Sequence, residues 1–229
     1  MKKIAILGAM EAEITPILEK LQNVKETKYA GNIYYEGTYN DRDIVLAYSK
    51  IGKVFAAITA TILIEKFKCD VLLFSGVAGG ISEDLKIGDL IIADKLCQHD
   101  VDITAFGHPH GFIPESILYS ETDETLRDIA KYVALDKDIE IKMGTIATGD
   151  QFIACEDKKN WISETFVAHA LEMEGAAVAV VCSSFEIPYF ILRSISDTAD
   201  TDANFNFEEF VESSAKRSAD FILAMIDEI

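Results

Sequence analysis

The chain has 229 residues and a formal net charge of −18, from 39 acidic and 21 basic side chains. With 49% hydrophobic residues, it fits a soluble globular protein with room for a proper core. The negative charge disfavours nucleic acid and anionic membrane surfaces as partners. No segment approaches the ~20 apolar residues of a membrane span, and no signal-peptide pattern is present, so we expect a cytoplasmic protein.

Short apolar runs alternate with amphipathic stretches along the whole chain. In order we expect strand Lys3–Leu7, helix Glu11–Leu21, strands Ile33–Tyr39 and Ile44–Ser49 joined by a hairpin turn at 40–43, and helix Val54–Phe67. There follow strand Asp70–Ser75, a glycine-rich turn at Gly76–Gly80, strand Leu90–Ala93 and a long loop over 102–120. The remaining elements are helix Thr122–Val133, strand Ile141–Thr148, helices Glu156–Glu164 and Glu174–Ser184, strand Tyr189–Ser194 and a last helix from about Phe207, capped by Asn206.

This alternation predicts the fold class. It is typical of an α/β fold with a central mixed sheet flanked by helices. We find no linker, repeat or low-complexity segment, so residues 1–229 are expected to form a single domain.

Familiar cofactor and metal motifs are missing. His108 and His110 flank Pro109, but no third ligand at zinc-like spacing accompanies them. We expect these two histidines, and also His99 and His169, to be ordinary solvated side chains. The four cysteines are far apart and form no CxxC pair, which favours reduced thiols. We expect neither a metal nor a cofactor.

Polar residues and glycines follow several of the predicted strands at the point where each strand ends. They are Glu13, Gly76–Gly80, Glu174, Arg193, Ser196 and Asp197. Taken singly, each has a structural explanation, such as a helix N-terminus, an ion pair or a turn. Because ligands in open α/β sheets bind at the carboxyl ends of strands, we expect these residues to meet at one site.

Seven segments, in this order, then point to a family. They are Gly8–Glu13, Ser49–Val54, Ser75–Gly80, Asp102–Gly107, Thr148–Ile153, Glu172–Ala176 and Arg193–Asp197. Together they closely resemble the bacterial methylthioadenosine/S-adenosylhomocysteine nucleosidases of the nucleoside phosphorylase superfamily, over nearly the whole chain. The resemblance implies hydrolysis of the N-ribosidic bond of 5′-methylthioadenosine and S-adenosylhomocysteine, and also of 5′-deoxyadenosine, with release of adenine.

The resemblance also implies catalytic roles. Asp197 matches the general acid that protonates adenine N7, which requires a raised pKa. Glu13 matches the general base that activates water and must be ionised. Glu174 and Met173 match the ribose-binding pair, and Arg193 matches the residue that positions the water and the carboxylates. A pair of carboxyl groups with opposite protonation suits this substitution.

Further residues are expected at the substrate. Phe152 resembles the residue that stacks on adenine, and the backbone of Ile153 the group that reads its edge. Gly79 would let the chain pass close to the ligand. Other expected contacts are Met10, Ile51, Val77, Ala78 and Ser196. Some relatives carry Ser at the position of Val77, so Val77 is not counted as a catalytic donor.

The long loop is expected to complete a neighbouring subunit. In the family a phenylalanine of this loop, here Phe106, reaches into the partner and helps to form the pocket for the 5′ substituent. Pro114 is expected to contribute there too, and Phe207 lines the same pocket from the C-terminal side. The resemblance therefore implies a homodimer.

Three alternatives stay open at this point. Certain relatives accept 6-amino-6-deoxyfutalosine, an intermediate of an alternative menaquinone route, and the sequence does not rank it against the thioadenosines. A phosphorolytic purine nucleoside or uridine phosphorylase would need cations for phosphate, whereas the turn after the first strand offers Glu13. A nucleoside-binding protein without activity would have no need for the set Glu13, Glu174 and Asp197.

Overall fold

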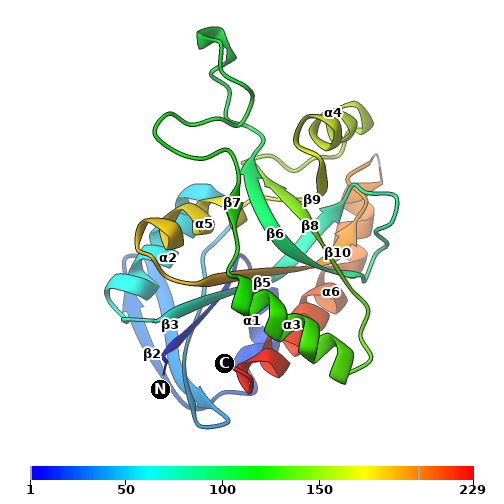
Figure 1. Cartoon of the computed structure of the whole chain (residues 1–229). Helices are drawn as coiled ribbons and strands as arrows, with labels where there is room; N and C mark the ends of the chain where they lie inside the picture. The colour runs from blue at the N-terminus through cyan, green and yellow to red at the C-terminus, as the bar shows by residue number, and fades with distance from the viewer. Residues whose placement is uncertain (1, 201) are drawn as a thin grey trace.

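Ten strands form one mixed sheet with helices on both of its sides in the computed structural model, which describes residues 2–200 and 202–229 (Figure 1). The strands are β1 (Ile4–Gly8), β2 (Gln22–Tyr29), β3 (Asn32–Tyr39), β4 (Arg42–Tyr48), β5 (Val71–Gly80), β6 (Leu90–Gln98), β7 (Ser120–Glu121), β8 (Ile141–Thr148), β9 (Ala168–Glu172) and β10 (Tyr189–Asp197). The helices are α1 (Glu11–Leu18), α2 (Lys53–Glu65), α3 (Glu124–Asp136), α4 (Glu156–Phe166), α5 (Gly175–Ser184), α6 (Ala203–Ile226) and the short 3₁₀ helix η1 (Thr104–Phe106). The predicted fold class is confirmed.

Strand β5 is the centre of the sheet. It pairs in parallel with β1 and β10, and β1 pairs in parallel with β4, which the hairpin strands β3 and β2 extend. On the other side, β10, β6, β8 and β9 follow one another and β9 returns to β5. These five strands form a closed ring, so the carboxyl ends of β5, β9 and β10 come close to those of β1 and β4.

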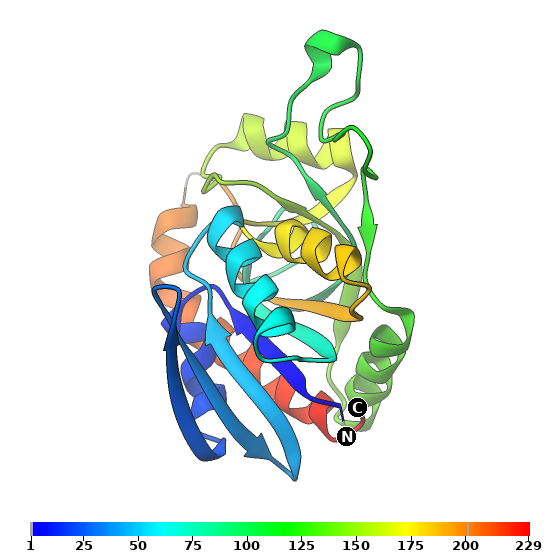
Figure 2. The ribbon, with the colours of Figure 1, turned by 90° about the vertical axis from the view of Figure 1, so that its left-hand side faces the viewer.

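Two apolar layers hold the sheet between its helices. On one side α2 and α5 lie next to each other (Figure 2), and small residues such as Ala60 and Ala179 let them approach the sheet closely. On the other side α1, α3 and α6 bury larger side chains, among them Ile17, Val133 and Phe221. Each fully buried large apolar side chain contributes about 1.5–3 kcal/mol, so both layers fix the sheet firmly.

The predicted turn at Gly76–Gly80 is wrong, because these residues continue β5. All are buried; Gly76–Gly79 pair with the last part of β10, from Gly76 opposite Arg193 to Gly79 opposite Asp197, and Gly80 pairs with Ala170 of β9. The glycines serve close approach rather than a turn. A Cβ at Gly76 would lie 2.7 Å from Glu13 Oε1, and one at Gly79 would lie 2.8 Å from Asp197 Oδ1.

Three short or polar strands were not predicted. Strand β2 is an exposed edge strand whose sequence, Gln-Asn-Val-Lys-Glu-Thr-Lys-Tyr, has no apolar alternation. Strand β9 has only five residues, and the two-residue β7 lies at the end of the expected loop. The hairpin between β3 and β4 is confirmed, with positive φ at Asn40 and Asp41, as its right-handed twist requires.

Helix boundaries also differ from the prediction. The last helix begins at Ala203 with Asp202 as its N-cap, so Asn206 is not the cap: its N–H already donates to the carbonyl oxygen of Asp202, at 3.0 Å. Helix α1 ends at Leu18 rather than Leu21, and α3 begins at Glu124. The side chain of Asp123 caps α3 by accepting from Leu126 N at 2.9 Å.

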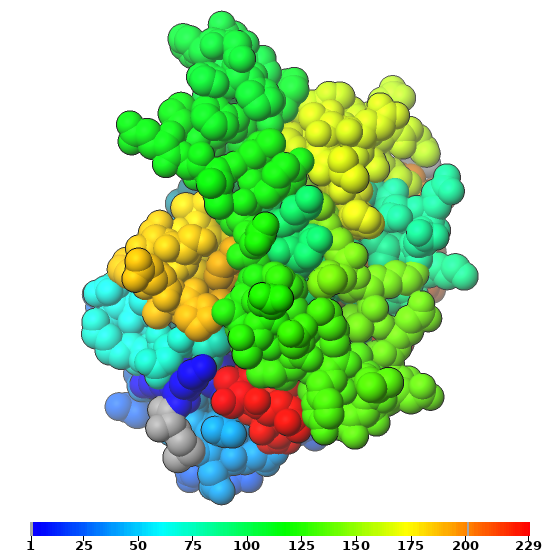
Figure 3. Space-filling view, in the orientation of Figure 1, coloured from blue at the N-terminus to red at the C-terminus, as the bar shows by residue number. Residues whose placement is uncertain are grey.

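The segment between β6 and β7 projects away from the rest of the molecule (Figures 1 and 3). Its tip carries the 3₁₀ helix η1, in which the Phe106 side chain is 81% exposed. Pro114 is exposed on the same segment. No helix among the described residues is long and apolar enough to cross a membrane.

Candidate active site

A cavity of about 280 Å³ lies where the carboxyl ends of several strands meet, the usual place for a ligand in an α/β sheet. It is lined by Ala9, Met10, Glu13, Ile51, Val77, Ala78, Gly79, Phe152, Leu171, Glu172, Met173, Glu174, Ser196, Asp197 and Phe207. Four of these side chains are carboxyl groups, and the rest are mostly apolar. The cavity therefore offers both an apolar surface and several titratable groups.

Most of the residues predicted from the sequence meet in this cavity. The exceptions are Ile153, which lines a small adjoining recess, and Arg193, which lies behind the wall and is 1% exposed. Phe106 and Pro114 lie on the projecting segment and do not line the cavity of their own chain. The structure adds Ala9, Leu171 and Glu172, which the sequence analysis did not single out.

Glu13 is held by backbone N–H groups from two sides. Its Oε2 accepts from Ala9 N at 2.5 Å and Met10 N at 2.9 Å, and its Oε1 accepts from Val77 N at 2.9 Å. Burial raises the pKa of Glu13 above its ordinary value, and Arg193 and these three donors offset the rise only in part. Because all three partners are donors, these hydrogen bonds favour the ionised form. A carboxylate has about four acceptor positions, so one position on Oε1 is left for a ligand.

Asp197 ends β10 at an irregular place in the sheet. The register against β5 shifts between Ile195 and Asp197, as in the bulges that re-aim side chains near active sites. The carboxyl group accepts from Ala199 N and from Ser196 Oγ, both at 2.9 Å. Burial raises the pKa of Asp197, and these two hydrogen bonds oppose the rise only partly. Asp197 is therefore suited to carry a proton and release it to a ligand.

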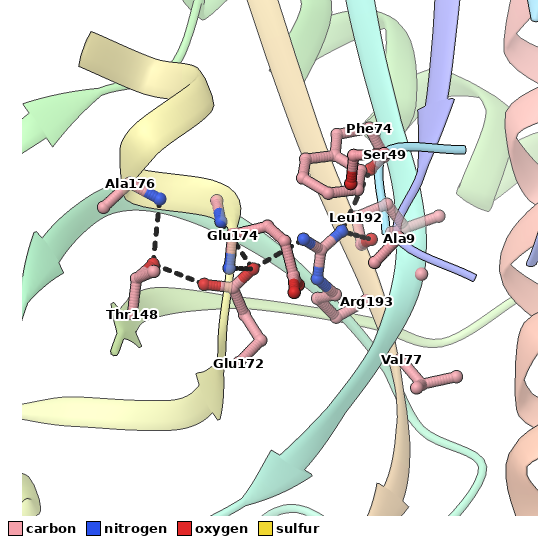
Figure 4. Close-up of polar contacts among 12 residues, drawn as sticks. Ala9, Ser49, Phe74, Val77, Thr148, Glu172, Glu174, Ala176, Leu192 and Arg193 are labelled. Carbon is pink, nitrogen blue, oxygen red and sulfur yellow. Dashed lines mark hydrogen bonds and ion pairs between the residues drawn. The ribbon is translucent and has the colours of Figure 1, made fainter. Parts of the chain in front are cut away.

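Glu172 and Arg193 form a buried ion pair behind the cavity (Figure 4). Arg193 Nη2 donates to Glu172 Oε2 at 2.6 Å, and its guanidinium lies 4.0 Å from the centre of the Phe74 ring. Arg193 Nη1 donates to the backbone carbonyl groups of Phe74 and Leu192. Arg193 thus places a positive charge within a cluster of carboxyl groups, but its guanidinium does not line the cavity.

The N-terminus of α5 completes the environment of Glu172 (Figure 4). Glu172 Oε2 accepts from Gly175 N at 2.6 Å and Glu174 N at 3.2 Å, and its Oε1 accepts from Thr148 Oγ1. Thr148 Oγ1 in turn accepts from Ala176 N at 2.8 Å. Anions are favoured at helix N-termini, which explains how a second carboxylate can be buried beside Glu174. The sequence block around Glu174 contained Glu172, but nothing in it distinguishes the two glutamates.

Glu174 is a third carboxyl group of the cavity whose pKa is raised. Burial and the neighbouring Glu172 carboxylate raise the pKa of Glu174 to about 8, against the opposing effects of the Gly52 N–H and Arg193. Gly52 N donates to Glu174 Oε1 at 2.7 Å. The free site therefore takes up a proton here easily, and a hydroxyl-rich or cationic ligand would favour the ionised form.

Aromatic and aliphatic side chains form the outer wall. Phe152 and Phe207 meet edge to face, with ring centroids 5.7 Å apart and planes at 79°, a favourable geometry for aromatic pairs. Phe152 remains 46% exposed and Ile51 53% exposed. Flat apolar surface at the entrance is suited to stacking a planar ring.

The histidines do not form a metal site. Within residues 2–200 and 202–229, no group of three or more His, Cys, Asp or Glu side chains could hold a metal ion. The prediction that His99 is solvated is wrong: it is 2% exposed, and the pKa of its ring is lowered by burial. Gly149 makes this burial possible, since a Cβ there would lie 2.3 Å from His99 Nε2.

The geometry brings two carboxyl groups of raised pKa to one apolar cavity: Glu13, which accepts from three backbone N–H groups, and Asp197, which ends β10. No Lys or Arg side chain is among the described residues that line it. In comparison with known proteins, the sequence profile of the "Phosphorylase superfamily" matches residues 3–227. The chain belongs to this superfamily.

Several relatives within the superfamily are similar over their whole length. An aminodeoxyfutalosine nucleosidase of Campylobacter jejuni is 52% identical, with 100% of each chain covered. A 5′-methylthioadenosine/S-adenosylhomocysteine nucleosidase of Geobacillus is 40% identical, with 99% of each covered. The structure also matches an aspartate-to-asparagine variant of the Helicobacter pylori methylthioadenosine nucleosidase with 5′-methylthioadenosine in its active site. That match has a TM-score of 0.99 at 49% identity and covers 100% of both chains.

The raised pKa of Glu174 predicts a pH-dependent stability. In the folded chain this group holds its proton up to about pH 8, whereas in the unfolded chain it loses it near its ordinary pKa of about 4.3. Its contribution to stability is therefore complete below that lower value and is lost as the pH rises through 8. Glu174→Gln removes the loss, so we expect a higher Tm than the parent at pH 9 and little difference at pH 5. A gain of about 1 kcal/mol corresponds to about 2–4 °C in a chain of this size.

Glu172→Gln is a comparison variant for this measurement and not a matched control, because it also removes a carboxylate that raises the pKa of Glu174. It breaks the buried ion pair with Arg193, which leaves an uncompensated buried charge and is strongly destabilising. Thermal unfolding of both variants at pH 5, 7 and 9 checks the prediction. Equal Tm differences for Glu174→Gln at pH 5 and pH 9 would contradict it.

Proposed function

We propose that this chain is a nucleosidase that hydrolyses the N-ribosidic bond of 5′-substituted adenosines, 5′-methylthioadenosine and S-adenosylhomocysteine among them, and releases adenine. One observation carries the proposal: Glu13, held by donors only, and Asp197, of raised pKa, line the same cavity. A displacement at the anomeric carbon needs a base for the incoming water and an acid for the leaving group. These two residues supply that pair.

The proposed reaction uses each carboxyl group once. Glu13 takes a proton from the attacking water through the open acceptor position on Oε1, and the water oxygen bonds to the anomeric carbon. The bond from that carbon to adenine N9 breaks, and its electron pair leaves with the base. Asp197 delivers its proton to N7 of adenine, so the products are neutral adenine and a 5-substituted ribose.

Ser196 supports Asp197 in both protonation states. When Asp197 is ionised, Ser196 Oγ donates to its Oδ2 at 2.9 Å. When Asp197 is protonated, Ser196 Oγ can accept from it and donate to the carbonyl oxygen of Ala78, 3.4 Å away. A side chain that changes its protonation during a reaction is stabilised throughout when both its protonated and its ionised form have hydrogen-bond partners.

The glutamates near the ribose favour positive charge on the sugar. Glu174 accepts from Gly52 N with one oxygen only, which leaves the other for ribose hydroxyl groups. Glu172 adds negative charge behind it, balanced by Arg193. Fixed charges directed at the group that becomes cationic stabilise an oxocarbenium-like transition state. Met173 and Val77 supply apolar contacts next to these charges.

The adenine ring fits the apolar side of the cavity. Phe152 offers a ring face at the entrance, and the backbone of Ile153 lies in the adjoining recess beside Gly79 and Asp197. A base placed there has its N7 edge toward Asp197. The 5′ substituent then points to the wall that contains Met10, Ile51 and Phe207.

Water rather than phosphate is the proposed nucleophile. Phosphate-binding sites rely on cationic side chains, and the described lining of this cavity carries four carboxyl groups and no Lys or Arg. We expect adenine to form from 5′-methylthioadenosine in phosphate-free buffer, at a rate that added phosphate does not raise. Chromatographic measurement of adenine and of the free 5-substituted ribose checks this. An absolute requirement for phosphate, or a ribose 1-phosphate product, would overturn it.

The range of substrates includes a second candidate. The Campylobacter jejuni relative is named for aminodeoxyfutalosine, and the Geobacillus relative for methylthioadenosine and S-adenosylhomocysteine. All of these reactions cleave the same N-ribosidic bond, so Glu13 as the base and Asp197 as the acid serve each of them. Aminodeoxyfutalosine is therefore proposed as a further substrate, with kcat/KM on each nucleoside as the measure of preference.

The acid role of Asp197 is tested by Asp197→Asn. The amide keeps the size and hydrogen-bonding of the side chain but cannot deliver a proton. We expect kcat to fall about 10²–10⁴-fold, while the Kd for an adenosine analogue, measured by calorimetry, changes little. The Helicobacter pylori aspartate-to-asparagine variant that holds methylthioadenosine in its active site is in keeping with this expectation.

Ser196→Ala is the control for Asp197→Asn. It removes a hydroxyl beside the carboxyl group but leaves the acid in place, so its loss of turnover should be much smaller. A turnover number in Asp197→Asn equal to that of the parent would remove Asp197 from the mechanism.

We also infer that the enzyme works as a homodimer. Two of the groups of exposed apolar side chains lie on the projecting segment and on the outer face of α2. They are Phe106 and Ile117 on the segment and Val54, Phe55 and Ile58 on the helix. Ile51, at the N-terminal side of α2, also lines the cavity. A partner's segment seated beside α2 would cover this apolar surface and add Phe106 and Pro114 to the wall around the 5′ substituent.

Subunit complementation tests this arrangement. We expect Phe106→Ala to raise KM and Glu13→Gln to abolish turnover, each as a purified homodimer. When the two variants are mixed and allowed to exchange subunits, the site with Glu13 receives Phe106 from its partner. In a random mixture about a quarter of all sites are then complete, and low KM returns. Activity that never exceeds the average of the separate variants, or a monomer in sedimentation, would contradict the proposal.

A further inference from the structure

A polar cluster outside the cavity joins three of the segments that form its wall. The cluster consists of Lys53, the first residue of α2, and of Asp100 and Asp150, which follow the ends of β6 and β8. None of these residues lines the cavity. We propose that the cluster is a positioning device, in which Lys53 and Asp100 hold the Gly52 N–H group on Glu174. The proposal rests on the nucleosidase function proposed above.

The ion pair is the centre of the cluster. Lys53 Nζ lies 2.6 Å from Asp100 Oδ1 and 3.1 Å from Gln98 Oε1. The Lys53 side chain is 17% exposed and that of Asp100 12% exposed. The other ion pairs of lysine in the described residues are more exposed. Since solvent screens exposed pairs strongly, this pair is the best placed of the lysine pairs to restrain its segments.

Asp150 ties the third segment to the other two. Its N–H donates to Asp100 Oδ2 at 2.8 Å, and its Oδ1 accepts from Lys53 N at 2.8 Å. The backbone adds a further connection, because His99 N donates to the carbonyl oxygen of Thr148 at 2.9 Å. The segment that follows β8 carries Phe152 into the cavity wall, so its position depends on these contacts.

Gly52 connects the cluster with the carboxylates of the site. Its φ of +101° is a conformation that side chains disfavour, and a Cβ there would lie 3.1 Å from Asp150 Oδ1. In this conformation Gly52 N points at Glu174 Oε1, 2.7 Å away, while the next N–H points at Asp150. The N–H group of Gly52 thus binds a residue of the site, and the next N–H group, that of Lys53, binds a residue of the cluster. Removing the contact with the cluster frees the segment to carry Gly52 N away from Glu174.

Loss of that N–H would change the chemistry of Glu174. The charged groups that face Glu174 are Glu172, Glu13 and Arg193, and the Gly52 N–H group is the largest of the contacts that favour its ionised form. Lys53→Met leaves the three charged side chains in place. Weakening the Gly52 contact therefore raises the pH at which Glu174 ionises and loosens the wall that carries Ile51 and Phe152.

The test compares Lys53→Met, Asp100→Asn and the double variant with the parent. We expect each single variant to lower kcat/KM about tenfold, the scale on which supporting contacts act. The double variant should have a kcat/KM no lower than that of the less active single variant. The pH at which kcat/KM rises on the acid side should shift upward in each. Lys53→Arg, which can still pair with Asp100, should restore most of the activity.

Lys142→Met is the matched control. Lys142 forms an ion pair of similar length, 3.0 Å, with Asp89, and lies outside the cavity lining. It should leave kcat/KM and the pH profile as in the parent. The same loss in Lys142→Met, or losses that multiply in the double variant, would overturn the positioning role.

Amide hydrogen exchange tests the cluster without using activity. The Gly52 N–H group should be protected in the parent and should exchange about tenfold faster or more in Lys53→Met and Asp100→Asn. If the parent released no adenine from any of the nucleosides, the proposed function would be wrong. Hydrogen exchange would still show whether Lys53 and Asp100 hold the Gly52 N–H group. Equal Gly52 protection in the parent and both variants would overturn the inference.

Discussion

The site depends on one buried cation among several buried carboxyl groups. Arg193 is 1% exposed and pairs with Glu172, while Glu13 and Glu174 lie nearby with no ion-pair partner in the part of the chain that the structure describes. Buried charges of one sign are costly unless they are paired and hydrogen-bonded. The fold meets this requirement mostly with backbone N–H groups. Glu13 receives three of them, Glu172 receives two from the start of α5, and Glu174 receives one from Gly52.

These contacts between backbone N–H groups and carboxyl groups explain why the sheet lies so close to the carboxyl groups around the cavity. Strand β5 approaches Glu13 and Asp197 so closely that Gly76 and Gly79 have no room for a side chain. The bulge in β10 turns Asp197 toward the cavity beside Gly79. Because one N–H group of β5 is also used on Glu13, the same strand forms the centre of the sheet and part of the site. Excess negative charge that is fixed in this way favours a cationic ribosyl group and disfavours phosphate.

The amino-acid sequence was sufficient to predict the fold class, because the apolar runs of β1, β4, β5, β8 and β10 are buried on both faces and look alike in any such sheet. The sequence was not sufficient where the conformation or burial of a residue depends on a contact with a residue that is distant along the chain. The glycines 76–80 have the local composition of a turn, yet they pair with β10 more than a hundred residues away. Strand β2 lies at an exposed edge and needs no apolar alternation. Glu172 and His99 were missed for the same reason, since the residues that bury them, Arg193 and Gly149, come from other strands.

The residues beyond the strand ends pose a separate physical problem. Past Tyr48, Gln98 and Thr148 the sheet no longer fixes the backbone, yet these three segments place Ile51 and Phe152 and give Glu174 its N–H partner. Side-chain contacts between the segments, such as Lys53 with Asp100 and Asp150 with Lys53 N, therefore hold the wall together with the backbone contact between His99 N and the carbonyl oxygen of Thr148. Since Asp100 also begins the projecting segment, a movement of that segment would reach the cavity wall through the same contacts.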